Sequence, residues 1–326
     1  MEQRERDELY MRRCLQLAAC GRMESRPNPM VGAVIVADGR IVGEGYHVRC
    51  GEGHAEVNAF ASVAAEDERL LKEATVYVSL EPCSHYGKTP PCADLIVSKG
   101  VRRVVVGCID PFAKVQGRGI EKLRKAGIEV TVGVLEAECQ WLNRRFFTFH
   151  REQRPYIILK YARTQDGFLD NHGQSLAIST PFTKMLVHRL RAEEDSIVVG
   201  RTTAEREHPR LDVRHWAGPS PKRFVLSSKA CCTAAADEDG ERPYRMVASI
   251  EELLRVCREE QLQSLIVEGG RLTLQSFIDS NLWDEIRVET APLCVGEGTP
   301  APSLPDNIVL KSKETYDGNT IQVYTK

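Results

Sequence analysis

One histidine and two cysteines in the first third of the chain constrain its fold more than any other feature. His54-Ala55-Glu56 opens an apolar, helix-like run, and Cys83 follows a strand-like run over 75–80, with Cys92 further along. One imidazole and two thiolates can supply three ligands of a tetrahedral Zn²⁺ and leave the fourth position to water. Glu56 follows His54 closely enough to carry protons to and from that water.

Each of these residues also has a plainer interpretation. A lone His-x-Glu is usually a solvated helix face, and two cysteines are more often small buried residues than ligands. Order favours the metal, because strand, Pro-Cys and helix in succession place the Cys83 thiolate near a helix N-terminus, where its charge is stabilised. The pattern therefore predicts zinc held by His54, Cys83 and Cys92, with Glu56 as a proton carrier. This arrangement is typical of zinc deaminases, although residues 84–91 separate the cysteines where the usual signature is P-C-x-x-C.

The length, net charge and cysteine count of the chain limit the kinds of protein it can be. A chain of 326 residues suits two domains, and the polar stretch 151–155 is the best boundary, giving domains at 1–150 and 151–326. The formal net charge of −2 provides no basic surface for nucleic acid. Eleven cysteines, an odd number, do not indicate a disulfide framework, so we expect a cytoplasmic location. No apolar run approaches the roughly 20 residues that span a bilayer, and the charged N-terminus lacks a signal-peptide core.

Strand-like and helix-like segments alternate along both halves, which predicts an α/β fold in each. We expect a helix from Asp7 to about Gly21, capped by Asp7, and one amphipathic helix from Glu136 to His150. The first half also predicts strands over 31–37, 40–45, 75–80, 101–107 and 128–132 and helices from His54 and over 119–126. The second half predicts strands over 155–160, 195–200, 222–226, 264–268, 284–291 and 320–324, and helices over 180–194, 250–259 and 272–279.

A longer set of motifs in the first half carries a family resemblance. Pro27-Asn28-Pro29, Gly45-Tyr46-His47 and His54-Ala55-Glu56 are followed by Pro82-Cys83-Ser84-His85 and Thr89-Pro90-Pro91-Cys92. In this order they resemble the bifunctional pyrimidine deaminase/reductase family of riboflavin biosynthesis. The resemblance implies a cytidine-deaminase-like α/β/α sandwich in which Asn28, His47, His85 and Lys88 bind the substrate, Lys88 suiting a phosphate. On the residues alone, Asn28 is equally a turn residue and Lys88 a solvated side chain.

The second half has no G-x-G-x-x-G and therefore lacks the Rossmann dinucleotide fingerprint. It does contain Val267-Glu268-Gly269-Gly270, where strand, glycines and helix follow one another and a pyrophosphate can approach the backbone. Alone, such a turn is often only a tight connection. Its surroundings resemble the reductase half of the same family, which implies a dihydrofolate-reductase-like α/β domain that uses NADPH.

The resemblance implies a role for individual residues of this second domain. Lys160 and Glu207 match residues suspected of protonating the sugar carbonyl oxygen or orienting the substrate. The implied substrate contacts are Ser175, Arg191, Leu211, Arg214 and Glu268, of which the arginines suit a phosphate because a guanidinium offers paired donors. The implied cofactor contacts are Ala162, Ala177, Thr203, Glu207, Ser228, Gly270, Arg271, Leu272, Thr273, Leu274, Gln275 and Ser276.

Some positions depart from the family pattern. Phe112 stands where the family usually has Asn in Asp-Pro-Asn-Pro, which puts one polar substrate contact in doubt. Glu207-His208 replaces a common Asp-Asp, and Ala177 replaces a usual Trp. Both of these changes lie where the cofactor is expected, so they bear on reductase efficiency more than on fold.

The resemblance implies consecutive reactions on a small phosphorylated pyrimidine. Zinc-hydroxide deamination would convert 2,5-diamino-6-(5-phosphoribosylamino)pyrimidin-4-one to 5-amino-6-(5-phosphoribosylamino)uracil, and NADPH would then reduce the ribosyl group to ribityl. One alternative is a deaminase alone, with a C-terminal domain of reduced or lost reductase activity. Another, a deaminase of nucleic acid or free nucleosides, is disfavoured by the net charge of −2 and by the arginines expected to hold a phosphate. We expect a homo-oligomer with no nucleic-acid or membrane partner.

Overall fold

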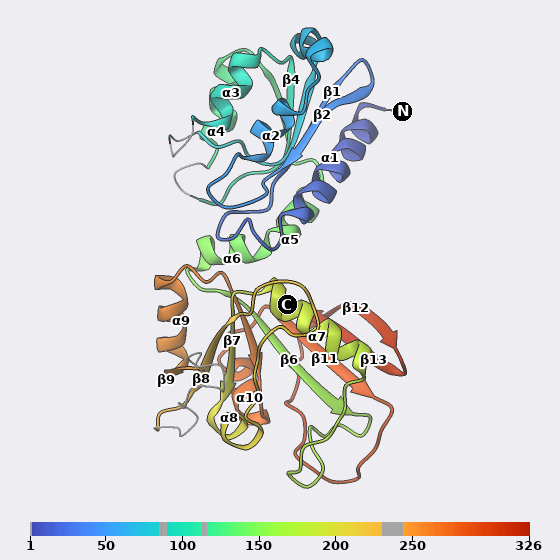
Figure 1. Cartoon of the computed structure of the whole chain (residues 1–326), viewed down its shortest axis with the longest axis vertical. Coiled ribbons are helices and arrows are strands. Elements are labelled where there is room, and N and C mark those ends of the chain that lie inside the picture. The colour runs from blue at the N-terminus through green and yellow to red at the C-terminus, as the bar shows by residue number, and fades with distance from the viewer. Residues whose placement is uncertain (1, 85, 87–89, 113–115, 230–243) are drawn as a thin grey trace. The chain divides into compact units, whose positions relative to one another are not determined.

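The computed structural model describes residues 2–84, 86, 90–112, 116–229 and 244–326. The chain forms two compact units, Met1–Glu152 and Gln153–Lys326 (Figure 1). The first unit is built on a five-stranded sheet and the second on an eight-stranded sheet. Among the described residues, no helix combines the length and the apolar character that crossing a membrane requires.

The first unit alternates strands and helices, as predicted. Its elements are α1 (Gln3–Cys20), β1 (Gly32–Ala37), β2 (Arg40–Tyr46), α2 (Ala55–Ala61), η1 (Ala65–Glu73), β3 (Thr75–Leu80), α3 (Cys92–Lys99), β4 (Arg103–Cys108), α4 (Arg118–Lys125), β5 (Glu129–Val132), α5 (Glu136–Leu142) and α6 (Arg144–Glu152). The sheet order is β2-β1-β3-β4-β5. Because β3, β4 and β5 are parallel, their carboxyl ends meet at one edge of the sheet.

Both faces of this sheet are covered by helices. On β1, Ala33 and Ile35 pack in an apolar layer with α2, α3 and α4, while Val34 and Val36 pack in a second layer with α1, α5 and α6. Successive strand residues point to opposite faces, so a short apolar strand can serve both layers. The predicted α/β/α sandwich is confirmed.

Helix α1 begins earlier than predicted. It starts at Gln3, and the side chains of Glu2 and Glu5 form a reciprocal capping box. Asp7 is not the cap: it lies inside the helix, 4% exposed, and its carboxylate accepts two hydrogen bonds of 2.8 Å from Arg103. The prediction was wrong because the charged first turn offers no apolar periodicity, and because the partner that explains Asp7 lies on a distant strand.

The single helix predicted over 136–150 is also wrong. Two helices, α5 and α6, meet at Asn143, whose φ of −99° and ψ of 22° leave the helical region. The Asn143 amide donates to the Met30 carbonyl and accepts the Met30 N–H, each at 2.8 Å. Asn side chains compete with helical hydrogen bonds, and here the competing partner is a loop that local sequence cannot reveal.

The second unit has a longer sheet that is mostly parallel. Its elements are β6 (Tyr156–Thr164), α7 (Pro181–Glu193), β7 (Ser196–Gly200), α8 (Arg201–Glu207), β8 (Lys222–Leu226), β9 (Arg245–Val247), α9 (Ile250–Glu259), β10 (Ser264–Glu268), α10 (Arg271–Asp279), β11 (Glu285–Ala291), β12 (Val309–Tyr316) and β13 (Asn319–Thr325). The order is β12-β13-β11-β6-β10-β7-β8-β9, in which only the β11–β13 and β12–β13 pairs are antiparallel. On β6, Ile157 and Leu159 pack with α9 and α10, whereas Tyr156 and Ile158 pack with α7 and α8.

The elements that sequence reasoning missed are short or exposed. Strand β12 lies at the edge of its sheet and most of its residues are exposed, so it shows no apolar alternation. Strand β9 has only 3 residues, and α8 buries only Ala204. These segments are held by their neighbours rather than by a pattern of their own.

Candidate active sites

The carboxyl end of β3 and the starts of α2 and α3 bring three metal-binding side chains together. His54 caps α2, Cys83 follows β3, and Cys92 is the first residue of α3. Nδ1 of His54 lies 3.5 Å from Cys83 Sγ and 3.3 Å from Cys92 Sγ, and the three donor atoms all lie within 4.8 Å of one another. Donors bound to one tetrahedral zinc at about 2.0–2.3 Å lie roughly 3.6 Å apart. The residues therefore fit zinc.

The position of Cys83 beside α3 favours its thiolate. The backbone N–H of Cys92, at the start of the helix, donates to Cys83 Sγ at 3.3 Å. Hydrogen bonds from Cys92 and His54 lower the pKa of the Cys83 thiol despite its burial. The predicted position near a helix N-terminus is confirmed, although that helix begins only at Cys92.

Glu56 is buried close to the metal donors. Its side chain lies in the first turn of α2 and is 3% exposed. Burial raises the pKa of the Glu56 carboxyl, and the negative charge of Cys83 adds to this effect. A carboxyl with a raised pKa can accept and release a proton closer to neutral pH, as general acid–base catalysis requires.

Two of the predicted pyrimidine contacts are bonded to each other. Asn28 Nδ2 lies 3.1 Å from His47 Nε2, and His47 Nδ1 lies 3.1 Å from the Gly53 carbonyl oxygen. A carbonyl only accepts, so Nδ1 carries the proton and the Asn28 amide donates to Nε2. Burial lowers the pKa of His47, which favours this neutral form. The other two predicted contacts, His85 and Lys88, lie outside the described residues.

In the second unit, a charged cluster lies where β10 ends. Lys160 on β6 stands opposite Glu268 on β10, and the Glu268 carboxylate accepts hydrogen bonds from Arg191 Nη2 at 2.8 Å and Nε at 3.4 Å. Burial alone would raise the pKa of Glu268, but the charges of Arg191 and Lys160 outweigh it and the pKa is lowered. At the end of α8, desolvation and the charges of Glu268 and Asp170 raise the pKa of Glu207. The cluster thus combines Glu268, whose lowered pKa favours the ionised form, with Glu207, whose raised pKa favours protonation.

The loop that carries Leu211 and Arg214 is fastened to α7. Arg191 Nη1 donates to the Asp212 carbonyl at 3.3 Å, and the backbone N–H of Arg214 donates to Nδ1 of His188 at 3.1 Å. The Arg214 side chain is exposed and forms an ion pair with Asp212, whereas Leu211 is buried with a φ of 52°. Helix α7 therefore fixes the predicted phosphate-binding loop at two points.

Sequence reasoning missed two residues that hold site segments in place. His188 is 5% exposed and holds the Arg214 loop, and Asn143 is 3% exposed and holds Met30, next to the Pro27-Asn28-Pro29 turn. Each of the two stands between an apolar residue and an arginine, which marks neither as an anchor, and their partners lie far along the chain.

The glycine turn after β10 has the predicted form. Gly269 has a φ of +141°, and Gly270 caps α10 while its N–H donates to Thr203 Oγ1 at 3.1 Å. A Cβ on Gly200 would lie 2.2 Å from Thr273 Oγ1, so α10 approaches the end of β7 closely. The predicted order of strand, glycines and helix is confirmed.

An open pocket of about 440 Å³ lies beside α10, the helix that begins at this turn. Two predicted cofactor residues, Ser228 and Ser276, line it together with Arg201, Lys229 and the α9 cap Ser249. Hydroxyls, cations and a helix N-terminus suit a ligand that carries phosphate groups. The residues present therefore fit NADPH.

Comparison with known proteins relates both sites to one family. Residues 4–108 match the cytidine and deoxycytidylate deaminase zinc-binding region, and residues 155–321 match the RibD C-terminal domain. The chain belongs to the RibD family. It is 39% identical over 322 residues to the riboflavin biosynthesis protein RibD of Aquifex aeolicus, covering 90% of this chain and 89% of that one. RibD of Escherichia coli is 36% identical over 330 residues, with 89% of each chain covered.

Solved RibD structures share the whole architecture. The diaminohydroxyphosphoribosylaminopyrimidine deaminase/5-amino-6-(5-phosphoribosylamino)uracil reductase of Thermotoga maritima gives a TM-score of 0.88 at 34% identity, covering 99% of both chains. RibD of Acinetobacter baumannii gives 0.89 at 29%, with the same coverage. As a RibD family member, the chain is a bifunctional enzyme of riboflavin biosynthesis, with a zinc-dependent deaminase domain and an NADPH-dependent reductase domain. The alternative of a deaminase alone is not favoured.

The predicted cofactor residues on α10 lie on different faces of that helix. Leu274 is fully buried in the core, and Gln275 Oε1 accepts the Ser303 N–H at 2.9 Å. Leu272 is 85% exposed. Residues 270–276 cover nearly two turns of helix, of which only one face can meet a ligand. Among the other predicted contacts, the exposed ones are Ser175, Ala177, Glu207, Arg214, Ser228 and Gly270, and the partly buried ones are Lys160, Ala162, Arg191, Thr203, Glu268, Arg271, Thr273 and Ser276.

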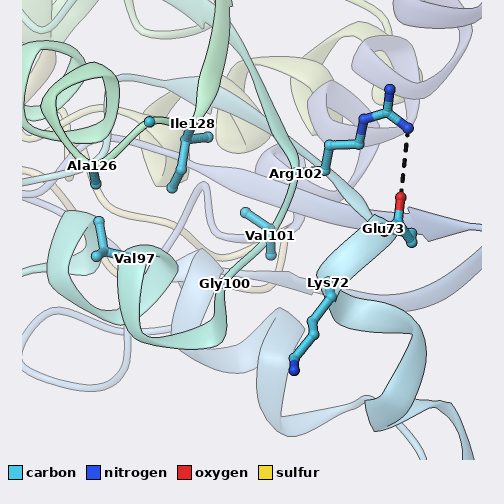
Figure 2. A pocket seen from close by; sticks show the side chains of 9 residues that line it. Lys72, Glu73, Val97, Gly100, Val101, Arg102, Ala126 and Ile128 are labelled. Atoms are coloured by element: carbon cyan, nitrogen blue, oxygen red, sulfur yellow. Dashed lines mark hydrogen bonds and ion pairs between the residues drawn. The ribbon is translucent and has the colours of Figure 1, made fainter.

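A second hollow, shown in Figure 2, lies in the deaminase unit but away from its metal donors. It is lined by Lys72, Glu73, Val97, Gly100, Val101, Arg102, Ala126, Gly127 and Ile128, and Arg102 pairs with Glu73 at 3.5 Å. These residues precede β3, β4 and β5 or close α3 and α4, so the hollow lies at the amino ends of the strands. Ligands in such sheets bind at the carboxyl ends, where Cys83 lies.

Proposed function

We propose that the first unit converts 2,5-diamino-6-(5-phosphoribosylamino)pyrimidin-4-one to 5-amino-6-(5-phosphoribosylamino)uracil, and that the second unit then reduces its ribosyl group to ribityl with NADPH. The observation that carries the proposal is the burial of Glu56 beside three donors that fit zinc. The name of the Thermotoga maritima relative, 34% identical, describes the same pair of activities.

In the deaminase site, each residue has one task. His54, Cys83 and Cys92 would hold zinc, which when bound would make a water molecule nucleophilic at neutral pH. Glu56 takes the proton that the water gives up and passes it to the amino group, which leaves as ammonia. One water enters and one ammonia leaves, so the step needs no redox partner.

The pyrimidine is oriented by Asn28 and His47. Neutral His47 is fixed by the Gly53 carbonyl and accepts the Asn28 amide, so both side chains are set before the substrate arrives. Because these two side chains are already in place, holding the pyrimidine ring in position for attack costs less entropy. His85 and Lys88 belong to the same proposal, with Lys88 on the substrate phosphate.

In the reductase site, the cofactor supplies hydride and the protein supplies placement and a proton. Lys160 and Glu207 protonate the oxygen of the opened sugar or orient it. Arg191 and Arg214 bind the substrate phosphate together with Ser175, Leu211 and Glu268. Both arginines are paired with carboxylates, Glu268 and Asp212, so phosphate binding has to share or displace these partners.

NADPH is held along α10 and in the pocket lined by Ser228 and Ser276. The Gly270 turn would hold the pyrophosphate, and Ala162, Ala177, Thr203, Arg271 and Thr273 would be further contacts. We further propose a cytoplasmic homo-oligomer. All described cysteines are free, as a reducing compartment requires, and light scattering on the purified chain tests the assembly.

A coupled assay tests the proposed function. The zinc-loaded chain is given the diamino substrate with and without NADPH, and ammonia release and NADPH oxidation are followed. Ammonia should appear in both cases, and NADPH should be consumed only after deamination. Cys83→Ser should lose zinc and ammonia release yet oxidise NADPH when given the uracil intermediate directly, while Cys50→Ser, at an exposed cysteine, should behave as wild type. Absence of ammonia release from the zinc-loaded wild type would refute the deaminase assignment.

A further inference from the structure

Glu81 has an unusual set of partners next to the metal site. It follows β3, two positions before Cys83, and is 4% exposed. Its Oε2 atom accepts the backbone N–H groups of Asp110 at 3.3 Å and Gly117 at 2.9 Å, and its Oε1 atom accepts those of Gly119 at 2.9 Å and Ile120 at 3.4 Å. In the described part of the chain, backbone amides alone bind this carboxylate and no basic side chain does.

Three of these amides belong to the start of α4. Gly117 caps the helix, and the first N–H groups of a helix have no acceptor within it. A carboxylate from another strand meets that need, and its charge is favoured at a helix N-terminus. The fourth amide, that of Asp110, lies just beyond β4, so Glu81 joins the carboxyl ends of β3 and β4 to α4.

A second observation places the same segment against the metal-binding strand. A Cβ on Gly119 would lie 2.1 Å from the Pro82 carbonyl oxygen, so α4 contacts the backbone immediately before Cys83. Asp110 in turn accepts the Phe112 N–H at 2.8 Å, which folds the chain back after β4. The segment around Asp110 and α4 therefore depends on Glu81 for its position beside Cys83.

We propose that Glu81 is a positioning residue of the deaminase: it fixes Asp110, just beyond β4, and Gly117 to Ile120, at the start of α4, as part of one wall of the pyrimidine site, without touching zinc or substrate. This inference rests on the deaminase function proposed above. It predicts that loss of the carboxylate impairs substrate binding more than the chemical step, and leaves the metal in place.

Hydrogen exchange of the full-length wild type tests the contact without a substitution. The amides of Gly117, Gly119 and Ile120 should exchange at least about tenfold more slowly than the amide of Leu272, which lies in the uncapped first turn of α10. Equal rates would overturn the proposal, because a helix start without an acceptor exchanges readily.

Kinetics of Glu81→Gln test the role. Gln keeps the shape, but its NH₂ group cannot accept the amides that one carboxylate oxygen now binds. The KM for the diamino substrate should rise about tenfold while kcat changes less than about threefold, with zinc content and the reduction of the uracil intermediate unchanged. Glu121→Gln is the matched control, since Glu121 lies on α4 itself but pairs with Lys125 at the surface.

The outcomes separate this inference from the function on which it rests. A wild type that releases no ammonia refutes the deaminase itself. An active wild type with an unchanged KM in Glu81→Gln, or loss of zinc in that variant, refutes only the positioning role. If Glu81→Gln does not fold, the exchange rates of the wild type still test whether the Glu81 carboxylate holds the amides at the start of α4, and equal rates still refute the proposal.

Discussion

Burial gives individual side chains in this protein the properties their proposed roles need. Glu56 is 3% exposed, and burial raises the pKa of its carboxyl. The residue pattern predicted Glu56 as a proton carrier, because a short interval from a metal ligand is a local feature. It could not predict Asn143 or His188, because their roles depend on loops distant in sequence. The family resemblance, in turn, assigned Leu274 to the cofactor, although that side chain fills the core.

Glu56→Gln should retain zinc and lose turnover. Gln has the same shape but cannot carry a proton, so kcat for deamination should fall about a thousandfold. Metal analysis and ammonia release measure the two effects. Glu52→Gln, at an exposed glutamate close by, should change neither. A Glu56→Gln rate within about tenfold of wild type would contradict the assignment.

His188 should make the reductase sensitive to acid. Burial and the charges of Arg191, Arg214 and His215 lower its pKa, while Asp212 opposes them. Because the folded-state pKa lies below the unfolded one, the neutral form contributes stability above the usual histidine range, and this is lost as pH falls. Protonation also removes the acceptor of the Arg214 N–H. The KM for the uracil intermediate should therefore rise several-fold between about pH 7 and pH 5.

The matched variant for this test is His188→Asn. The Asn oxygen can accept the same N–H but does not titrate in this range. Its KM should stay nearly constant over the pH range in which the wild-type value rises. If the variant and the wild type show the same dependence, another group is responsible.

Most helices and strands of this protein could be predicted from local sequence pattern, but some depend on contacts with distant residues. The strands and helices around the metal site follow from apolar runs, and the α/β architecture of both units was predicted correctly. The break between α5 and α6 was not, because Asn143 bonds to Met30, and β12 was not, because an exposed edge strand carries no alternation. Apolar periodicity in the sequence indicates that a segment packs against a sheet. It gives no information about a segment that is held by one side chain or by one neighbouring strand.

The two glycines before α10 should respond differently to substitution. Gly269 has a φ of +141°, so Gly269→Ala should destabilise the reductase unit by about 1–3 kcal/mol. Gly270 has a φ of −73°, and a Cβ there meets only Thr203 Oγ1 at 3.7 Å. Gly270→Val should therefore fold normally but weaken NADPH binding about tenfold by blocking backbone approach. Thermal unfolding and NADPH fluorescence measure both, and wild-type affinity in Gly270→Val would exclude the turn from the cofactor site.

At the scale of the whole molecule, each unit has its own sheet, core and proposed site. A fragment 1–152 should bind zinc and deaminate without NADPH, with a kcat within about threefold of the full chain. A fragment 1–142 is the matched control: it lacks Asn143, Phe146 and Phe147, so its sheet face and the Met30 loop lose their cover. A folded, zinc-loaded fragment 1–152 without deaminase activity would show that the units depend on each other.

The bond between Asn143 and Met30 also sets an order of events during synthesis. The ribosome releases the chain from its N-terminus, so His54, Cys83 and Cys92 all emerge well before Asn143. At ordinary elongation rates the interval is about three to ten seconds. The nascent chain can therefore present all three predicted metal ligands while the Pro27-Asn28-Pro29 turn still lacks its anchor, and, on the proposed role of Asn28, its substrate site is complete only once Asn143 has been made.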